Sequence, residues 1–158
     1  LKLVVADEPT TALDVTIQDQ ILKLINRIKE ELNMSVILIT HDLGVVAQMC
    51  DRVAVMYAGM IMEKTDVESL FYHPMHPYTD ALIRTLPSSK KIGEELESIP
   101  GTPPNLNTPV TGCPFAPRCA YAQEKCRNEC PSLTEWEPGH FVRCHRRDLE
   151  ICLKGIQK

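Results

Sequence analysis

Two short, uninterrupted apolar runs, separated by a longer amphipathic segment, constrain the fold of this chain more than any other feature. Residues 3–6 and 36–39 have the pattern of strands that are buried on both faces. Between them, residues 15–33 carry isoleucine and leucine at helical spacing, and Asp14 stands where a helix N-cap belongs. A strand, a helix and a second strand in this order predict a parallel sheet with a right-handed crossover.

The sequence after the second strand predicts further short elements. We expect a helix at residues 42–50, a hairpin formed by residues 52–57 and 60–64, and two helices near residues 66–72 and 78–86. Ala58 and Gly59 supply the hairpin turn, and the His-Pro-Met-His-Pro segment at residues 73–77 separates the two helices, because proline interrupts a helix. Beyond Pro87 we expect mostly loop.

Composition divides the chain into two parts. Of the 12 prolines, 11 lie from Pro74 onward, and of the seven cysteines, six lie between Cys113 and Cys152. A proline-rich segment with few long apolar runs needs a cross-link or a metal for order. We therefore predict an α/β domain over residues 1–72 and a small, Cys/Pro-rich, loop-rich C-terminal extension over residues 73–158.

Charge and hydropathy exclude some classes of protein. The net charge of −4 gives no electrostatic footprint for nucleic acid, so we expect no nucleic-acid partner. No apolar run is long enough to span a bilayer, and no signal peptide precedes the first apolar run. Because the sequence starts without Met and directly within an apolar run, we expect it to be part of a larger protein.

Two carboxylates follow the first predicted strand directly. Asp7 and Glu8 would lie at the carboxyl end of that strand, which is where open α/β sheets place their ligand sites. An aspartate in this place can hold Mg²⁺, and the next carboxylate can polarise an attacking water molecule. A solvated strand end before the turn at Pro9 is the alternative, and an Asp-Glu pair alone favours that simpler interpretation.

The surrounding sequence resembles a known family. The segment L-V-V-A-D-E-P-T-T-A-L-D, residues 3–14, resembles the Walker B segment and D-loop of ABC-type ATPases. The segment I-T-H-D-L, residues 39–43, is similar to their H-loop. Thr11 stands where the family more often has serine, and it keeps the hydroxyl group. The resemblance implies an α/β fold that is a partial P-loop (RecA-like) nucleotide-binding domain of the ABC type.

The resemblance also implies roles for four residues. Asp7 would hold the magnesium of Mg-ATP, and Glu8 would be the catalytic base or the residue that positions the attacking water. His41 would contact the γ-phosphate and that water. Asp14 would belong to the D-loop, which meets the opposing subunit in the closed dimer. The sequence contains no G-x-x-x-x-G-K-[ST] loop, glutamine loop or signature segment. We therefore predict that the isolated chain neither binds ATP usefully nor hydrolyses it.

Clustered cysteines distinguish the extension. Between Cys113 and Cys144 the spacing is C-x5-C-x6-C-x3-C-x13-C. Beside an ATPase of the reducing cytosol, such a cluster favours metal ligation over disulfides. Four thiolates can hold a [4Fe–4S] cluster or a tetrahedral Zn²⁺, and the spacing alone does not decide between them. Free structural cysteines are the remaining alternative.

The extension carries a second resemblance. H-P-Y-T at residues 76–79, I-P-G-T-P-P at 99–104, G-C-P-F-A-P-R-C at 112–119 and E-P-G-H at 137–140 resemble the C-terminal extension of oligopeptide and dipeptide importer ATPase subunits. Nickel importers of the same class are similar. In that family four cysteines can carry a [4Fe–4S] cluster. The positions that match are Cys113, Cys119, Cys126 and Cys144, and Cys130 is an extra cysteine that could replace Cys126.

Together the two resemblances imply part of the ATP-hydrolysing subunit of a peptide-class ABC importer, at the cytoplasmic face of the cell membrane. The implied partners are a sister ATPase subunit, the membrane permease subunits and, indirectly, an extracytoplasmic solute-binding protein. The transported solute (peptide, dipeptide or nickel) stays open. The alternative is a stand-alone iron–sulfur or zinc module for interaction or redox sensing, without ATPase activity. The absence of a phosphate-binding loop favours this alternative for the chain taken by itself.

Overall fold

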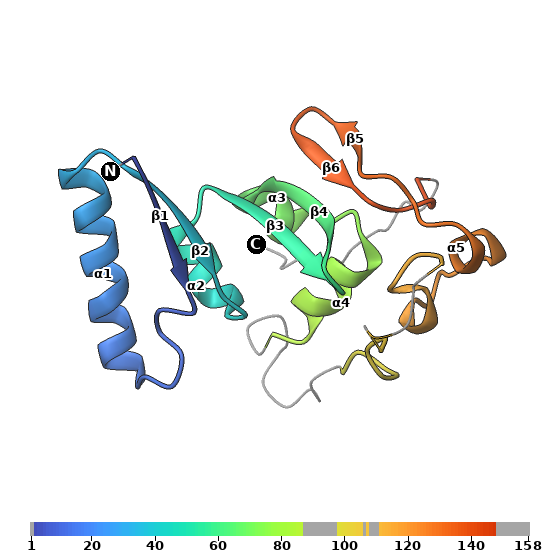
Figure 1. Cartoon of the computed structure of the whole chain (residues 1–158), viewed down its shortest axis with the longest axis horizontal. Coiled ribbons are helices and arrows are strands. Elements are labelled where there is room, and N and C mark those ends of the chain that lie inside the picture. The colour runs from blue at the N-terminus through green and yellow to red at the C-terminus, as the bar shows by residue number, and fades with distance from the viewer. Residues whose placement is uncertain (1, 87–97, 106, 108–110, 148–158) are drawn as a thin grey trace. The chain divides into compact units, whose positions relative to one another are not determined.

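The chain has a mixed α/β fold, as predicted, and it divides into two compact units between Asp51 and Arg52. The computed structural model describes residues 2–86, 98–105, 107 and 111–147 (Figure 1). The predicted boundary at residue 72 separates two kinds of sequence, whereas the division after Asp51 separates two packing units. The predicted division into an α/β domain (residues 1–72) and a C-terminal extension (residues 73–158) therefore stays a prediction.

The first unit has the predicted order of strand, helix, strand and helix. Its elements are β1 (Leu3–Asp7), α1 (Val15–Glu31), β2 (Ser35–Ile39) and α2 (Leu43–Met49). β1 and β2 pair in parallel, with Leu3 opposite Ser35 and Asp7 opposite Ile39. The parallel pairing was predicted, and it brings the carboxyl ends of both strands to the same edge.

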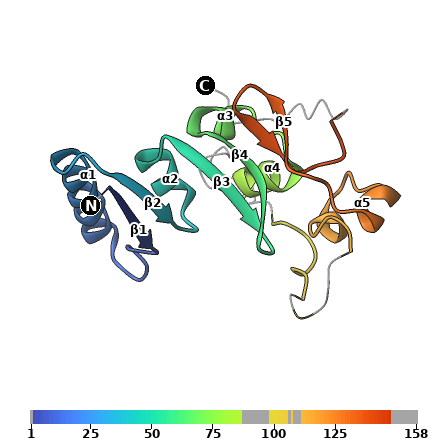
Figure 2. The ribbon, with the colours of Figure 1, turned by 45° about the horizontal axis from the view of Figure 1, so that its top comes forward.

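The two strands are covered on one face only, so the prediction that both faces are buried was wrong. Burial alternates along each strand, and the side chains of Val5 and Ile37 are 59% and 49% exposed. α1 lies along one side of the strand pair (Figure 2). A continuous apolar run usually indicates a strand that is buried on both faces. Here helices cover one face of the two-stranded sheet, so the side chains on the other face are exposed.

Aspartates begin both helices of this unit. One carboxylate oxygen of Asp14 accepts hydrogen bonds from the backbone N–H groups of Thr16 and Ile17, both at 3.0 Å, which confirms the predicted N-cap. Asp42 caps α2 in the same way, accepting from the Gly44 N–H at 2.8 Å. These caps fix the points at which the chain leaves the strand ends and enters the helices.

The second unit begins with the predicted hairpin. Its first elements are β3 (Arg52–Tyr57), β4 (Met60–Asp66), α3 (Val67–Tyr72) and α4 (Pro77–Arg84). Ala58 and Gly59 have φ angles of 50° and 77°, the positive values that a two-residue hairpin turn needs. Both predicted helices are present, and they pack against the hairpin strands.

The segment after residue 97 has more regular structure than predicted. It contains η2 (Ala116–Arg118), α5 (Glu124–Asn128), β5 (Thr134–Glu137) and β6 (His140–Val142). Most of the described residues after 97 are loop, as expected. The strands β5 and β6 were not predicted, and they extend the hairpin into an antiparallel sheet in the order β3-β4-β6-β5. These strands are short and lack a clear apolar alternation, so their pairing partner specifies them more than their own sequence does.

An aromatic cluster forms the centre of the second unit. Tyr57, Met62 and Phe115 are buried together, and the ring of Phe115 meets the ring of Tyr57 edge-on at a centroid distance of 5.5 Å. Tyr78 lies 5.2 Å from the same ring. Cys113 and Cys119 pack against this cluster, so the aromatic core supports the cysteine-bearing segment directly.

Candidate functional site

The parallel register brings Glu8 and His41 into contact. Asp7 pairs with Ile39 at the end of the strands, and the Glu8 N–H donates to the Ile39 carbonyl oxygen at 2.9 Å. The Glu8 Oε1 and His41 Nδ1 atoms are 3.0 Å apart. Two residues that are 33 positions apart in the sequence therefore share one strand-end site.

The backbone and the following turn orient the Glu8 carboxylate. Glu8 has a φ angle of 45°, in the left-handed region that costs a residue other than glycine about 1–2 kcal/mol. The Thr11 N–H donates to the Glu8 carbonyl oxygen at 3.2 Å, and the Thr11 hydroxyl donates to Glu8 Oε2 at 2.9 Å. Each carboxylate oxygen of Glu8 thus has one side-chain partner.

These contacts favour the ionised form of Glu8. The hydrogen bond with His41 lowers the pKa of the Glu8 carboxyl below its ordinary value, and the Thr11 hydroxyl lowers it further. The side chains of His41 and Glu8 are 77% and 46% exposed, so the pair is open to a ligand. Asp7 is exposed at the same strand end, whereas the Asp14 carboxylate caps α1. The structure therefore groups Asp7, Glu8 and His41 and gives Asp14 a capping role.

Four of the predicted cysteines line one cavity in the second unit. They are Cys113, Cys119, Cys126 and Cys144. The backbone joins two of these cysteines directly, because the Cys113 N–H donates to the Cys126 carbonyl oxygen at 2.8 Å. Cys130 is not among the residues that line this cavity, and its Sγ lies 3.8 Å from the Met60 Sδ.

Burial and backbone N–H groups act in opposite directions on these thiols. Burial raises the pKa of Cys144 to about 11, and it also raises the pKa values of Cys113 and Cys119. Backbone N–H donors partly offset this effect, among them the Arg146 N–H, which donates to the Cys144 Sγ at 3.3 Å. Burial thus favours the protonated form of these three thiols, whereas the backbone N–H donors favour the thiolate.

The cysteine side chains are not arranged as a complete coordination site for a single metal ion. Within residues 2–86, 98–105, 107 and 111–147, no group of three or more His, Cys, Asp or Glu side chains is placed to hold a metal ion. The predicted iron–sulfur or metal-binding character is therefore not supported by coordination geometry. What supports it is the chemistry of the donor set, since four thiols surround one cavity and backbone donors face their sulfur atoms.

A buried polar network, which the sequence analysis missed, lies beside the cysteines. Glu63 is fully buried, and its Oε1 lies 2.6 Å from the His140 Nε2. The Met75 and His76 N–H groups donate to the same carboxylate at 2.6 and 3.0 Å. His76, 1% exposed, lines the cysteine cavity. The sequence showed His76 and His140 as parts of motifs, but no pattern marked Glu63 as their partner.

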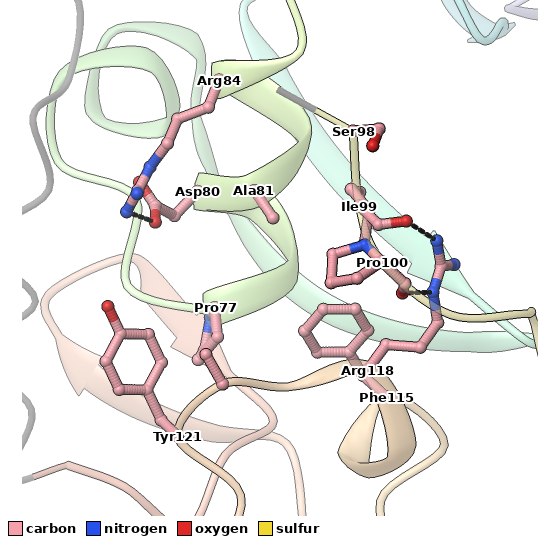
Figure 3. Close-up of a pocket in the computed structure, with 11 residues that line it drawn as sticks. Pro77, Asp80, Ala81, Arg84, Ser98, Ile99, Pro100, Phe115, Arg118 and Tyr121 are labelled. Atoms are coloured by element: carbon pink, nitrogen blue, oxygen red, sulfur yellow. Dashed lines mark hydrogen bonds and ion pairs between the residues drawn. The ribbon is translucent and has the colours of Figure 1, made fainter. Parts of the chain in front are cut away.

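A second cavity, of about 180 Å³, adjoins the cysteine cavity (Figure 3). Both cavities share Pro77, Phe115 and Tyr121 as wall residues. On one side Arg84 forms an ion pair with Asp80 along α4. On the other side Arg118 donates to the carbonyl oxygens of residues 99 and 100, both at 2.8 Å. Its polar side chains are thus engaged with neighbouring groups of the fold.

Two further properties concern the described residues as a set. The six cysteines that the structure describes are free thiols. In the described residues, no helix combines the length and the apolar character that a membrane span requires.

Comparison with known proteins gives a consistent assignment. Residues 62–126 match the family described as "Oligopeptide/dipeptide transporter, C-terminal region". The oligopeptide transport ATP-binding protein OppD of Salmonella typhimurium is 51% identical over 150 residues, which are 95% of this chain and 44% of that protein. The dipeptide transport ATP-binding protein DppD of Bacillus subtilis is 51% identical over 146 residues, 92% of this chain and 44% of that protein.

A solved structure of CbiO1 from Clostridium perfringens, part of the ABC transporter complex CbiONQ, is 34% identical, with a TM-score of 0.42. That match covers 44% of this chain and 28% of the CbiO1 chain. This chain itself spans less than half the length of the curated relatives that it matches.

The strand-end pair and these relatives define the class: the chain is related to the ATP-binding proteins of peptide transporters. Within that class, its residues 62–126 match the C-terminal region of oligopeptide/dipeptide transporters. Both resemblances stated from the sequence are thereby confirmed.

Proposed function

We propose that this chain is part of the ATP-hydrolysing subunit of a peptide-class ABC importer. The observation that carries the proposal is the contact between Glu8 and His41 at the carboxyl ends of two parallel strands. The likeness to ATP-binding proteins of oligopeptide and dipeptide transport supports it. In the complete subunit, Asp7 would hold the Mg²⁺ that accompanies ATP.

Glu8 and His41 divide the work on the attacking water in this proposal. The Glu8 carboxylate, kept ionised by His41 and Thr11, orients the water and accepts its proton. His41 holds Glu8 by one ring nitrogen and leaves the other free to contact the γ-phosphate. Asp14 orders the turn after β1 and, in the proposal, contacts the opposing subunit.

The proposal assigns the activity to the complete subunit. The sequence of this chain contains no phosphate-binding loop, so the chain alone would neither hold nor hydrolyse ATP. The complete subunit would work with a sister ATPase and the permease subunits at the cytoplasmic membrane face. An extracytoplasmic solute-binding protein would supply the solute.

The first experiment is an immunoblot of source cells with an antibody against the cysteine segment. A band at twice 17.8 kDa or more supports the proposal, and a band at 17.8 kDa contradicts it. The longer protein would then be purified and assayed for ATP hydrolysis. The Glu8→Gln variant should lose at least about a hundredfold in turnover, as expected for a general base. The Glu30→Gln variant, changed on the exposed part of α1, is the matched control. Equal turnover in both variants would contradict the role of Glu8.

We also propose that Cys113, Cys119, Cys126 and Cys144 hold a [4Fe–4S] cluster. Their arrangement around one cavity supports this proposal, and Zn²⁺ on the same four thiolates is the alternative. Such a cluster supplies a one-electron redox centre when bound. The test is anaerobic assay of purified protein for iron and acid-labile sulfide. Zinc without iron, or neither metal, would contradict the cluster.

The cysteine cavity also supports a second candidate function. Together with the missing phosphate-binding loop, it suits a stand-alone iron–sulfur or zinc module without ATPase activity. A 17.8 kDa band that contains iron or zinc would favour this function over the transporter subunit.

A further inference from the structure

Arg146 contacts two cysteine-bearing segments of the second unit. Its backbone N–H donates to the Cys144 Sγ at 3.3 Å, and its guanidinium Nη1 donates to the Tyr121 carbonyl oxygen at 3.0 Å. The Tyr121 N–H in turn donates to the Cys119 thiol. The side chain of Arg146 therefore joins the segment after β6 to the segment after η2, and its backbone N–H contacts a cysteine of its own segment.

Arg146 also supplies positive charge to the cavity. Among the described residues that line the cavity, it is the one lysine or arginine. Its guanidinium donates to the carbonyl oxygen of Tyr121, which also lines the cavity. Arg118 and Arg143 do not line the cavity. Arg118 donates to the Pro100 carbonyl oxygen, and Arg143 donates to the carbonyl oxygens of Ile61 and Pro131.

The positive charge of Arg146 would affect the reduction potential of a cluster in this cavity. A [4Fe–4S] cluster on four thiolates is an anion, and one-electron reduction makes it more negative. A fixed cation at the cavity wall stabilises the reduced state more than the oxidised state, because the Coulomb energy grows with the charge of the partner. A half-buried guanidinium has this effect with less solvent screening than an exposed one.

Building on the proposed cluster, we propose that Arg146 is a positioning residue that raises the reduction potential of the cysteine site and holds Cys119 and Cys144 in register. The electron comes from an external one-electron donor and goes to the cluster iron, without making or breaking a protein bond. Arg146 itself ligates nothing.

The test compares four forms of the full chain, each reconstituted anaerobically with ferrous iron and sulfide. They are the unchanged chain, Arg146→Gln, Arg146→Lys and the control Arg147→Gln. Arg147 is exposed and donates to the Trp136 carbonyl oxygen, so its variant changes the net charge equally but away from the cavity lining. Midpoint potentials are measured by dithionite titration followed by visible absorption and electron paramagnetic resonance.

Arg146→Gln should lower the equilibrium constant for reduction by about tenfold, which is about 59 mV for a one-electron couple. Arg146→Lys should restore most of the loss, and Arg147→Gln should stay within about twofold of the unchanged chain. Loss of iron from Arg146→Gln with retention by Arg146→Lys supports the proposal as well.

Equal potentials, or equal iron loss, in Arg146→Gln and its Lys counterpart would overturn the role of the charge. An unshifted potential in a fully loaded Arg146→Gln protein would overturn this inference alone. If the unchanged chain takes up no iron and sulfide, the proposed cluster fails, and the role of Arg146 fails with it.

Discussion

Replacing Glu63 by glutamine tests how strongly the buried polar network stabilises the second unit. The carboxylate is fully buried and accepts three hydrogen bonds, from the N–H groups of Met75 and His76 and from the His140 ring. A glutamine side chain has the same shape, but it has only one acceptor oxygen and adds an NH₂ donor. The variant therefore changes hydrogen bonding and charge without changing volume.

The geometry sets the size of the effect. Glu63 Oε1 accepts from Met75 and His140, and Oε2 accepts from His76, so either orientation of a glutamine amide places its NH₂ against at least one buried donor. Each buried donor left without an acceptor costs about 1–3 kcal/mol, and either orientation of the amide leaves at least one of the three donors in this position. We expect Glu63→Gln to lower the free energy of unfolding of this unit by about 2–3 kcal/mol.

Urea unfolding followed by fluorescence measures this change where it occurs. The chain has a single tryptophan, Trp136, which lies in β5 of the same sheet as Glu63. Glu137→Gln is the matched control, because Glu137 is an exposed glutamate of the same sheet and should change stability by less than about 0.5 kcal/mol. If Glu63→Gln and its control unfold within about 1 kcal/mol of each other, the network contributes no more than an exposed glutamate, and the reasoning is refuted.

Three further predictions concern other parts of the structure. Burial, opposed by the charge of Glu63, lowers the pKa of His76 to about 4, so the unfolded chain binds a proton between pH 6.5 and 4 that the folded chain does not. The free energy of unfolding, measured by urea titration, should therefore fall by about 3 kcal/mol as the pH falls through that window. A His76→Asn variant whose free energy of unfolding depends on pH as strongly as that of the unchanged chain would contradict this. Gly112→Ala should lower the free energy of unfolding by about 1–3 kcal/mol in the same assay, because a Cβ at this position would overlap backbone carbonyl oxygens of α5. In the comparison variant Gly44→Ala, the nearest atom to the new Cβ belongs to a side chain, at 3.1 Å. If the two variants lose the same free energy of unfolding, the overlap at Gly112 is refuted. His41→Ala should raise the pKa of Glu8, measured by NMR titration of the carboxyl carbon, and an unchanged pKa would show that the 3.0 Å contact is absent in solution.

The strand-end pair could be predicted from sequence because its determinants are local. Each strand is a run of apolar residues that ends at a polar residue, and parallel pairing then aligns the two ends. The apolar run placed Asp7 and Glu8 at the end of the first strand, and the resemblance to the H-loop placed His41 at the end of the second. Their contact was not predicted. The exposure of the strand side chains could not be predicted from local sequence, because it depends on which elements cover each face of the sheet. Val5, for example, is 59% exposed.

The polar network of the extension could not be predicted in this way. Glu63 lies in a strand, His76 caps a helix, and His140 follows a Pro-Gly turn, so each residue has an ordinary local explanation. Their contact depends on β6 pairing with β4, and β6 has only three residues. A strand this short carries too little periodicity to indicate its partner, and Glu63 and His140 are 77 positions apart in the sequence.

β4 organises the cysteine cavity, although it carries no cysteine. Residues 60–63 each contact the segment that leads to Cys144. The contacts are those of Met60 with Cys130, of the Ile61 and Met62 carbonyl oxygens with Arg143, and of Glu63 with His140. Since Cys144 lies two residues beyond β6, its position depends on this pairing as well as on the turn that carries it. The hairpin therefore belongs by packing with the extension, even where its sequence resembles a nucleotide-binding domain. A perturbation of β4 would reach the cysteine cavity through four consecutive backbone positions, without any change to a cysteine.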